Sequence, residues 1–275
     1  MLDEKAKRQI GAILRLEWKK SFLNRRAWWI YLLALGPVLL TGGHALDSFA
    51  RPGRADFGED LMIFSGIFQL FYLRFGIFFG AVGIFANLFR GEMLERTLHY
   101  YLLSAVKREW VVVGKYLAGL IASAVVFCVS VTISYFFILV HFGQTAQEYL
   151  IKGPGLQHLL WYNVTTVLAC AGYGAVFLLL GLVFRNPMIP AAIVLVLEGI
   201  NAFLPSALQQ ISIIYYLKSL CPLELPRQPG LDALVSVSGA TAPAAVAILG
   251  LLIVSSILLF LACRRAQDLE ISYAE

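Results

Sequence analysis

Charged residues are scarce in this chain. They make up 14% of its 275 residues, whereas hydrophobic residues make up 59%. A soluble domain has about a quarter charged residues, so this composition excludes a largely soluble protein and predicts an integral membrane protein. In a soluble protein the net charge of +5 would suggest nucleic acid. In a membrane protein we expect the cations to set its orientation, and we predict no nucleic-acid partner.

Nucleotide-binding and catalytic motifs are also missing. No GxxxxGK[ST] segment occurs, so we predict that the chain does not bind ATP by that route. HExxH and GxSxG are absent as well. The histidines are scattered over different loops and both predicted sides of the membrane: His44, His99, His141 and His158. We therefore predict no enzyme activity, no catalytic residue, and no metal or cofactor in this chain.

Cysteine is sparse, with four residues. Cys128 and Cys170 lie within apolar segments and Cys263 at the end of one, which leaves only Cys221 in a predicted outer loop. A disulfide within the outer loops of one chain is thereby excluded. A reduced Cys221 and a bond between two Cys221 copies across a dimer both stay open.

A signal peptide is not recognisable in residues 1–26, which carry acids and many bases without a cleavage site after a short apolar run. Apolar residues instead recur at helical spacing, at Ile10, Leu14, Trp18 and Phe22. This pattern predicts a helix that lies in the membrane interface, with its bases toward anionic head groups.

Long apolar segments dominate the rest of the chain, and we predict that six of them cross the bilayer. Their approximate ranges are 27–45, 66–89, 115–140, 159–184, 187–204 and 242–262. Between them lie a charged loop over 90–114 and an outer segment over 205–241, and residues 266–275 form a tail. Gly76 and Gly80 mark a face where another helix can approach closely. The expected fold is an all-α integral membrane protein.

The distribution of Lys and Arg predicts the orientation. With both ends inside, 16 of the 22 Lys and Arg residues fall on the inner side and 5 on the outer side. Such a bias over short loops places both termini and the 90–114 loop in the cytosol. We expect the protein in the inner (cytoplasmic) membrane, with membrane lipid around it.

The 90–114 loop begins with an amphipathic helical pattern. One side of this helix carries polar residues, namely Glu92, Glu95, Arg96 and His99. The other side carries apolar residues, namely Leu94, Leu98 and Tyr101. Ser104 is placed to cap a second helix, after which the apolar sequence resumes.

This loop resembles the one after the second span in permease subunits of the ABC-2 type, the membrane halves of ATP-binding cassette exporters. The resemblance rests on the following segments: Gly91-Glu92, Glu95-Arg96-Thr97-Leu98, Leu102-Leu103-Ser104, Arg108-Glu109 and Gly114-Lys115-Tyr116-Leu117. That family usually has a proline shortly after the serine, where this chain has Ala105-Val106.

The resemblance implies that the loop is a coupling helix that docks into a groove on a separate ATPase subunit. We expect Glu92, Glu95, Arg96 and His99 to form the docking face, and the three apolar residues to anchor the helix to the bundle. A type V exporter-like fold is implied, with an N-terminal elbow helix and re-entrant outer helices before the last span. It also implies a dimer of permease subunits, homomeric or heteromeric, with two ATPase subunits that bind ATP and Mg²⁺. The apolar spans fit an amphiphilic substrate such as a lipid or a drug.

Two ionisable residues lie within predicted spans, where charge is costly. Arg74 and Glu198 fall at similar depths, about 22 Å and 16 Å from the inner boundary at 1.5 Å per residue. They form either an interhelical pair or a shared polar patch with Asn201; alternatively Arg74 snorkels outward and Glu198 is protonated. Two other functions stay open: an ion-coupled carrier that uses Glu198, and an ABC subunit that transmits force to envelope proteins.

Overall fold

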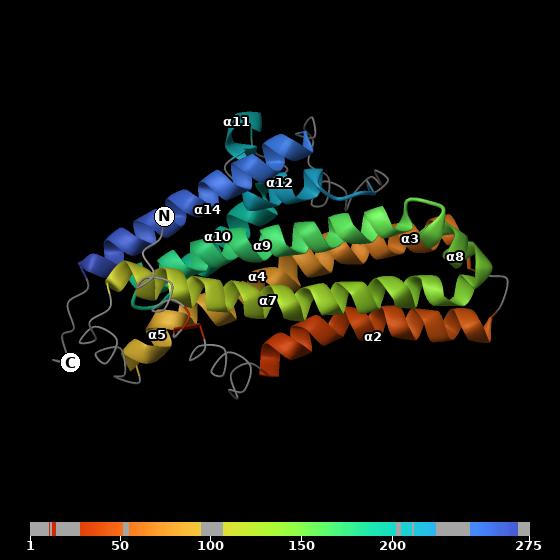
Figure 1. Ribbon diagram of the computed structural model, residues 1–275, viewed down its shortest axis with the longest axis horizontal. Helices are drawn as coiled ribbons and strands as arrows, with labels where there is room; N and C mark the ends of the chain where they lie inside the picture. Colours follow the sequence, from red (N-terminus) through yellow and green to blue (C-terminus); the bar gives the residue numbers. More distant parts are fainter. Residues whose placement is uncertain are drawn as a thin grey trace.

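The computed structural model describes residues 11, 13–14, 28–51, 55–94, 107–201, 205–210, 212–223 and 243–268. Regular structure in these ranges is entirely helical (Figure 1). The helices are α2 (Trp28–Ala50), α3 (Phe57–Gly66), η2 (Ile67–Gly76), α4 (Ile77–Ala81), η3 (Val82–Ala86), α5 (Asn87–Leu94), α7 (Arg108–Leu139), η4 (Val140–Phe142), α8 (Gln144–Ile151), α9 (Gly155–Val183), α10 (Met188–Gly199), α11 (Ser206–Gln209), α12 (Ile213–Ser219) and α14 (Ala244–Gln267).

The long helices lie side by side in a bundle, and α14 packs obliquely across α9 and α7 (Figure 1). We call the end that contains residues 46–51, 55–60 and 140–158 the distal end, at the right of Figure 1. The opposite end, which contains residues 87–94, 107–115, 184–188 and 262–268, is the proximal end. The connections between neighbouring spans thus alternate between the two ends.

Five helices are long and apolar enough to cross a membrane. They are Trp28–Ala50, Phe57–Met93, Arg108–Phe142, Gly155–Val183 and Ala244–Gln267. The sixth predicted span, over 187–204, contains α10 of only 12 residues, which rises about 18 Å at 1.5 Å per residue and falls short of a bilayer core of about 30 Å. The backbone leaves helical geometry at Ile200, after Gly199. An all-helical multi-pass membrane protein is confirmed, and the count of six spans stays a prediction.

The predicted N-terminal and outer segments are described only in part. Gly11, Ile13 and Leu14 are helical, and the rest of the expected elbow helix over 1–26 lies outside the described residues. The outer segment over 205–241 contains α11 and the seven-residue helix α12, which packs against α14 and α9. Re-entry of these helices into the membrane stays a prediction.

The second span combines α3, η2, α4, η3 and α5, and two of its parts are π-helical, namely Ile67–Gly76 and Val82–Ala86. A π-helical stretch contains more residues per turn and therefore rotates the side chains that follow it to a new face. The sequence does not predict this rotation of the side chains, because the segment is apolar on nearly every side.

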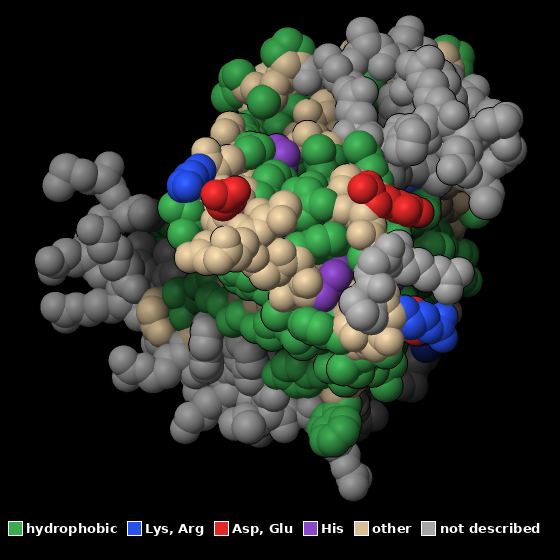
Figure 2. All heavy atoms as spheres, turned by 90° about the vertical axis from the view of Figure 1, so that its right-hand side faces the viewer, with side chains coloured by type: hydrophobic (Ala, Val, Ile, Leu, Met, Phe, Trp, Pro, Cys, Tyr) green, Lys and Arg blue, Asp and Glu red, His purple; other side chains and the backbone are tan. Residues whose placement is uncertain are grey.

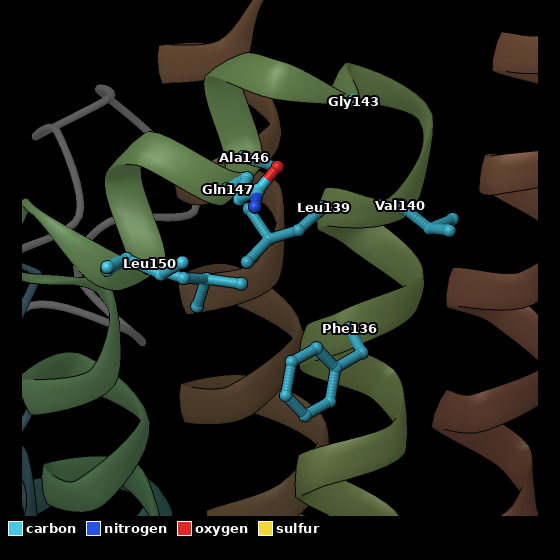
Figure 3. A pocket seen from close by; sticks show the side chains of 8 residues that line it. Phe136, Leu139, Val140, Gly143, Ala146, Gln147 and Leu150 are labelled. Atoms are coloured by element: carbon cyan, nitrogen blue, oxygen red, sulfur yellow. The ribbon is translucent and has the colours of Figure 1, made fainter.

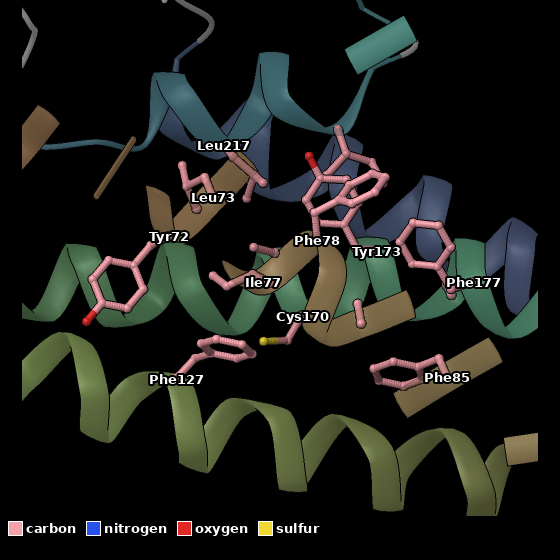
Figure 4. Packing of buried hydrophobic residues seen from close by; sticks show 14 of the residues in the cluster. Tyr72, Leu73, Ile77, Phe78, Phe85, Phe127, Cys170, Tyr173, Phe177 and Leu217 are labelled. Carbon is pink, nitrogen blue, oxygen red and sulfur yellow. The ribbon is translucent and has the colours of Figure 1, made fainter. Parts of the chain in front are cut away.

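Aromatic side chains fill the core between the second span and α9. Phe78 packs edge-on against Tyr173 and Phe177, with ring centroids 5.3 Å and 5.0 Å away (Figure 4). Toward the distal end, Phe64 contacts Tyr135 and Tyr162 in the same manner, at 5.2 Å and 5.0 Å. Edge-to-face pairs of this kind stabilise a core beyond the area they bury.

Glycines allow the backbones of the second span and α9 to touch. A Cβ at Gly181 would lie 2.6 Å from the carbonyl oxygen of Ala86, and one at Gly174 would lie 2.6 Å from the Phe85 ring. The predicted close face of Gly76 and Gly80 is confirmed, since a Cβ at Gly80 would lie 2.7 Å from the Phe127 ring. Small residues at helix interfaces permit this proximity.

Large apolar side chains cover the outside of the bundle. Leu32 and Leu39 on α2 are 71% and 64% exposed, and Leu249 and Ile257 on α14 are 59% and 54% exposed. An open apolar pocket lies at the distal end between the last turns of α7 and α8, lined by Phe136, Leu139 and Leu150 among others (Figure 3). Such surfaces are typical of a protein whose neighbours are lipid tails or other apolar helices.

Candidate functional site

The end of α5 and the first turns of α7 are joined by a buried ion pair. Nζ of Lys115 lies 2.8 Å from Oε1 of Glu92, and the two side chains are 0% and 8% exposed. Lys115 also lies over the Phe89 ring, with its Nζ 5.5 Å from the ring centroid. Because α7 begins at Arg108, Lys115 is inside a helix and not at the loop boundary where the sequence analysis placed it. The pair therefore joins the two flanks of the charged loop.

The central part of that loop, residues 95–106, lies outside the described residues. Docking and anchoring roles predicted for Glu95, Arg96, Leu98, His99 and Tyr101 therefore stay predictions, as does the role of the Leu94 side chain. Glu92 was predicted to face outward with the docking residues. In the structure its side chain turns inward instead, because Lys115 offers a buried charge partner.

Further contacts tie the start of α7 to both terminal regions of the chain. Arg108 donates a hydrogen bond to the carbonyl oxygen of Gln267 in α14, at 2.7 Å, and the Gln267 amide donates to the Glu109 carboxylate. Near the N-terminus, Ile13 is 5% exposed, and its side chain lies 3.0 Å from where a Cβ on Gly114 would stand. Movement at this point would therefore reach α5, α14 and the N-terminal segment together.

A second polar site surrounds Glu198 near the end of α10. Its carboxylate accepts hydrogen bonds from the Ser212 hydroxyl at 2.7 Å and from the backbone N–H groups of Ile213 and Ile214, each at 3.0 Å. The Tyr173 hydroxyl donates a longer bond, at 3.5 Å. The first N–H groups of a helix have no partner within the helix, so Glu198 supplies the cap that α12 would otherwise lack. It thereby holds α10, α12 and α9 together.

Of the alternatives left open for Arg74 and Glu198, the direct ion pair does not form. The carboxylate uses its oxygens on the start of α12, although Arg74 and Glu198 are close enough for their charges to interact. Nε of Arg74 is buried without a hydrogen-bond partner. Asn201 is 1% exposed, and its amide donates to the carbonyl oxygen of Gln209 at 3.2 Å, away from the carboxylate. The three predicted residues therefore do not share one hydrogen-bond network.

Lys218 of α12, which is close enough to Arg74 for their charges to interact, was not predicted from the sequence. Burial, and then the positive charge of Arg74, lower the pKa of Lys218 to about 7. The outer segment was expected to contain re-entrant helices, but the sequence alone does not show that this lysine would be buried beside Arg74.

Two of the four histidines, His44 and His141, lie together, which corrects part of a second expectation; His99 lies outside the described residues. His44 at the end of α2 and His141 in η4 both contact Asp60 of α3 at the distal end. They come from three helical segments far apart in the sequence, so no short spacing could have revealed them. The four cysteines are free, and none forms a disulfide within the chain.

A family model described as ABC-2 family transporter protein matches residues 13–201, more than two thirds of the chain. Comparison with curated proteins gives no match. The matched range includes the charged loop, both residues of the buried ion pair, and the Glu198 site as far as Asn201. The chain therefore belongs to the ABC-2 family of transporter proteins and is a multi-pass membrane permease.

Proposed function

We propose that this permease is the membrane half of an ATP-driven exporter and receives the work of ATP hydrolysis at residues 95–106. The observation that carries the proposal is the buried ion pair between Glu92 and Lys115. The two residues belong to opposite ends of the segment that resembles the coupling loop, so a force applied to that segment acts on both partners. The nucleotide and Mg²⁺ are held by two copies of a separate ATPase subunit.

The contacts around this pair define how the force spreads. Glu92 lies on α5, which continues the second span, and Lys115 lies on α7, an unbroken helix of 32 residues. Arg108 and Glu109 extend the connection to α14 through Gln267. Displacement of the loop would then tilt three long helices, and the π-helical stretches of the second span are sites where such a helix can bend.

The same proposal assigns the docking contacts to Glu95, Arg96 and His99. Glu92 leaves that group, because a carboxylate that is buried against Lys115 cannot also be presented to another subunit. Its role is to anchor the start of the loop, together with the predicted apolar anchors Leu94, Leu98 and Tyr101.

The proximal end faces the cytosol in this proposal, and the protein resides in the inner membrane. Basic side chains gather there, including Arg90, Lys107, Arg185, Arg264 and Arg265. At the distal end, acidic and basic side chains both appear (Figure 2), but among its described residues only Arg51 and Lys152 are Lys or Arg. Short basic loops favour the cytosolic side, where an ATPase subunit can reach residues 95–106.

Exposed apolar faces support a dimer of two permease subunits. Only Ala191 of α10 is buried within the chain, while Ile189, Ile193 and Val196 of the same helix are 57% to 64% exposed. A second subunit would cover part of this surface, and a path between two such faces suits an amphiphilic substrate such as a lipid or a drug.

Glu198 fits this proposal better than it fits an ion-coupled carrier. A carrier carboxylate must lose and regain its proton during each cycle. All four groups that contact Glu198 donate to it, and two of them are backbone N–H groups that cannot reverse their role. We assign Glu198 the structural role of holding α12.

Purification from native membranes in mild detergent tests the proposal. We expect an ATPase subunit to accompany the chain and to be lost in Glu95→Lys combined with Arg96→Glu. The control is Glu148→Lys, an exposed charge reversal at the distal end whose partner, Lys152, is itself exposed. Absence of an ATPase from an intact permease dimer, or equal loss in the control, would overturn the proposal.

A further inference from the structure

The distal end holds a buried carboxylate between two imidazoles. Asp60 is 3% exposed, and its Oδ2 lies 3.0 Å from Nε2 of His44 and 2.9 Å from Nε2 of His141. The three ligand-type atoms all lie within 4.8 Å of one another. The proposed transport function uses none of these residues.

His141 is the unusual member of the group. Its side chain is 5% exposed, yet neither ring nitrogen has a hydrogen-bond partner among the described residues. Nε2 is near the Asp60 carboxylate without the alignment of a hydrogen bond. The rings of Phe142 and Phe49 pack against that of His141, with ring centroids 4.1 Å and 6.1 Å away. A buried polar group without a partner costs about 1–3 kcal/mol, so this imidazole is suited to a ligand that the described part of the chain does not supply.

Two imidazole nitrogens and one carboxylate oxygen are a ligand set suited to Zn²⁺ and related transition metals, and unsuited to Ca²⁺ or Mg²⁺. Tetrahedral Zn²⁺ with bonds of about 2.0–2.2 Å holds its ligand atoms about 3.3–3.6 Å apart. The two separations from Asp60 are 2.9 and 3.0 Å, and all three ligand atoms lie within 4.8 Å of one another, so side-chain adjustments at the two histidines would admit the ion. The side chain of His44 is 33% exposed, which gives the ion a route from solvent.

We propose that His44, Asp60 and His141 form a binding site for Zn²⁺ at the distal end. Each ligand belongs to a different element, since His44 lies on α2, Asp60 on α3 and His141 on η4 after α7. The bound ion joins the distal ends of the first three spans, with its fourth position open to water. Because this proposal does not depend on ATP or on an ATPase subunit, its failure would leave the proposed transport function intact.

Direct metal binding tests the site. The full-length chain is purified in detergent with a tag that lacks histidine, stripped with a chelator, and titrated with Zn²⁺ by calorimetry; metal content is then measured by mass spectrometry. We expect about one Zn²⁺ per chain, since the described residues contain one such three-ligand set, and no comparable binding of Mg²⁺. His141→Ala and Asp60→Asn should each weaken binding at least about tenfold, because loss of even an outer-shell partner costs that much.

The matched control is His158→Ala, which removes a histidine at the same end whose partner is Tyr149, at 2.6 Å. It should bind Zn²⁺ like the unmodified chain. If the buried variants fail to fold, His44→Ala replaces them, since that side chain is partly exposed. The visible spectrum of Co²⁺ then reports whether His44 is a ligand. Failure of the folded, unmodified chain to bind Zn²⁺, or undiminished binding by the ligand variants, would overturn the proposal.

Discussion

Lys115 and Glu92 face each other with 2.8 Å between Nζ and Oε1, and both are almost completely buried. One residue precedes residues 95–106 and the other follows them. The loop that is expected to meet the ATPase therefore starts and ends at one fixed point.

Lys115→Met should strongly destabilise the permease, because it leaves the Glu92 carboxylate buried without its lysine. Breaking one partner of a buried ion pair costs about 3–5 kcal/mol, whereas replacing both by apolar residues is often neutral. We therefore expect Lys115→Met combined with Glu92→Leu to regain most of the lost melting temperature in detergent. In the double variant, the stimulation of ATPase activity by substrate should remain weaker than in the unmodified protein, because the charged connection is gone. Normal coupling in a stable double variant would contradict this role.

Gly181→Ala should destabilise the contact between α9 and the second span. The added Cβ would lie 2.6 Å from a backbone oxygen of Ala86, which cannot rotate away. Overpacking of this kind costs about 1–3 kcal/mol. Gly43→Ala is the control, because a Cβ there meets nothing within 4 Å, and the same change inside a helix should be neutral or stabilising. Thermal unfolding of both variants in detergent gives the comparison, and equal melting temperatures would contradict the close contact.

Glu198→Leu should release the start of α12, because it removes the acceptor for two backbone N–H groups and the Ser212 hydroxyl. Glu198→Gln keeps an acceptor oxygen and should be milder, and Ser212→Ala should cost only about 1 kcal/mol. Hydrogen exchange at Ile213 and Ile214 measures the effect directly. Proton flux into liposomes should be the same for Glu198→Gln and the unmodified chain; a loss of flux would favour the carrier alternative.

Lys218 predicts a dependence of stability on pH. Its pKa is lowered to about 7 in the folded protein, against about 10.4 in an unfolded chain. Between these values the unfolded state binds more protons, so stability should rise as the pH increases from about 7 to about 10. Below about pH 7 the lysine is charged in both states, and the full cost of its burial remains. Lys218→Met should flatten the rise and raise the melting temperature at pH 6. An unchanged pH profile in this variant would contradict the assignment.

The sequence was sufficient for those features that depend on composition and on local pattern. Apolar segments predicted the long helices, and Gly76 and Gly80 predicted a close helix contact, because both are properties of residues near one another in the chain. The ion pair of Glu92, the cap that Glu198 gives to α12, and the meeting of His44 with His141 depend on tertiary contacts. The length of α10 was also missed, because hydropathy remains high across Gly199 and does not report where the helix breaks.

The backbone contact between Gly181 and Ala86 has a mechanical consequence. Where backbones touch, no layer of side chains separates the helices, so α9 and the second span cannot slide past each other and should move as one rigid body. Shear within the subunit must then occur at elements that are loosely held. The helix α10 buries only Ala191, and its main attachment is the set of hydrogen bonds that Glu198 accepts near its end. We therefore expect the rest of α10 to be displaced first as the subunit changes shape.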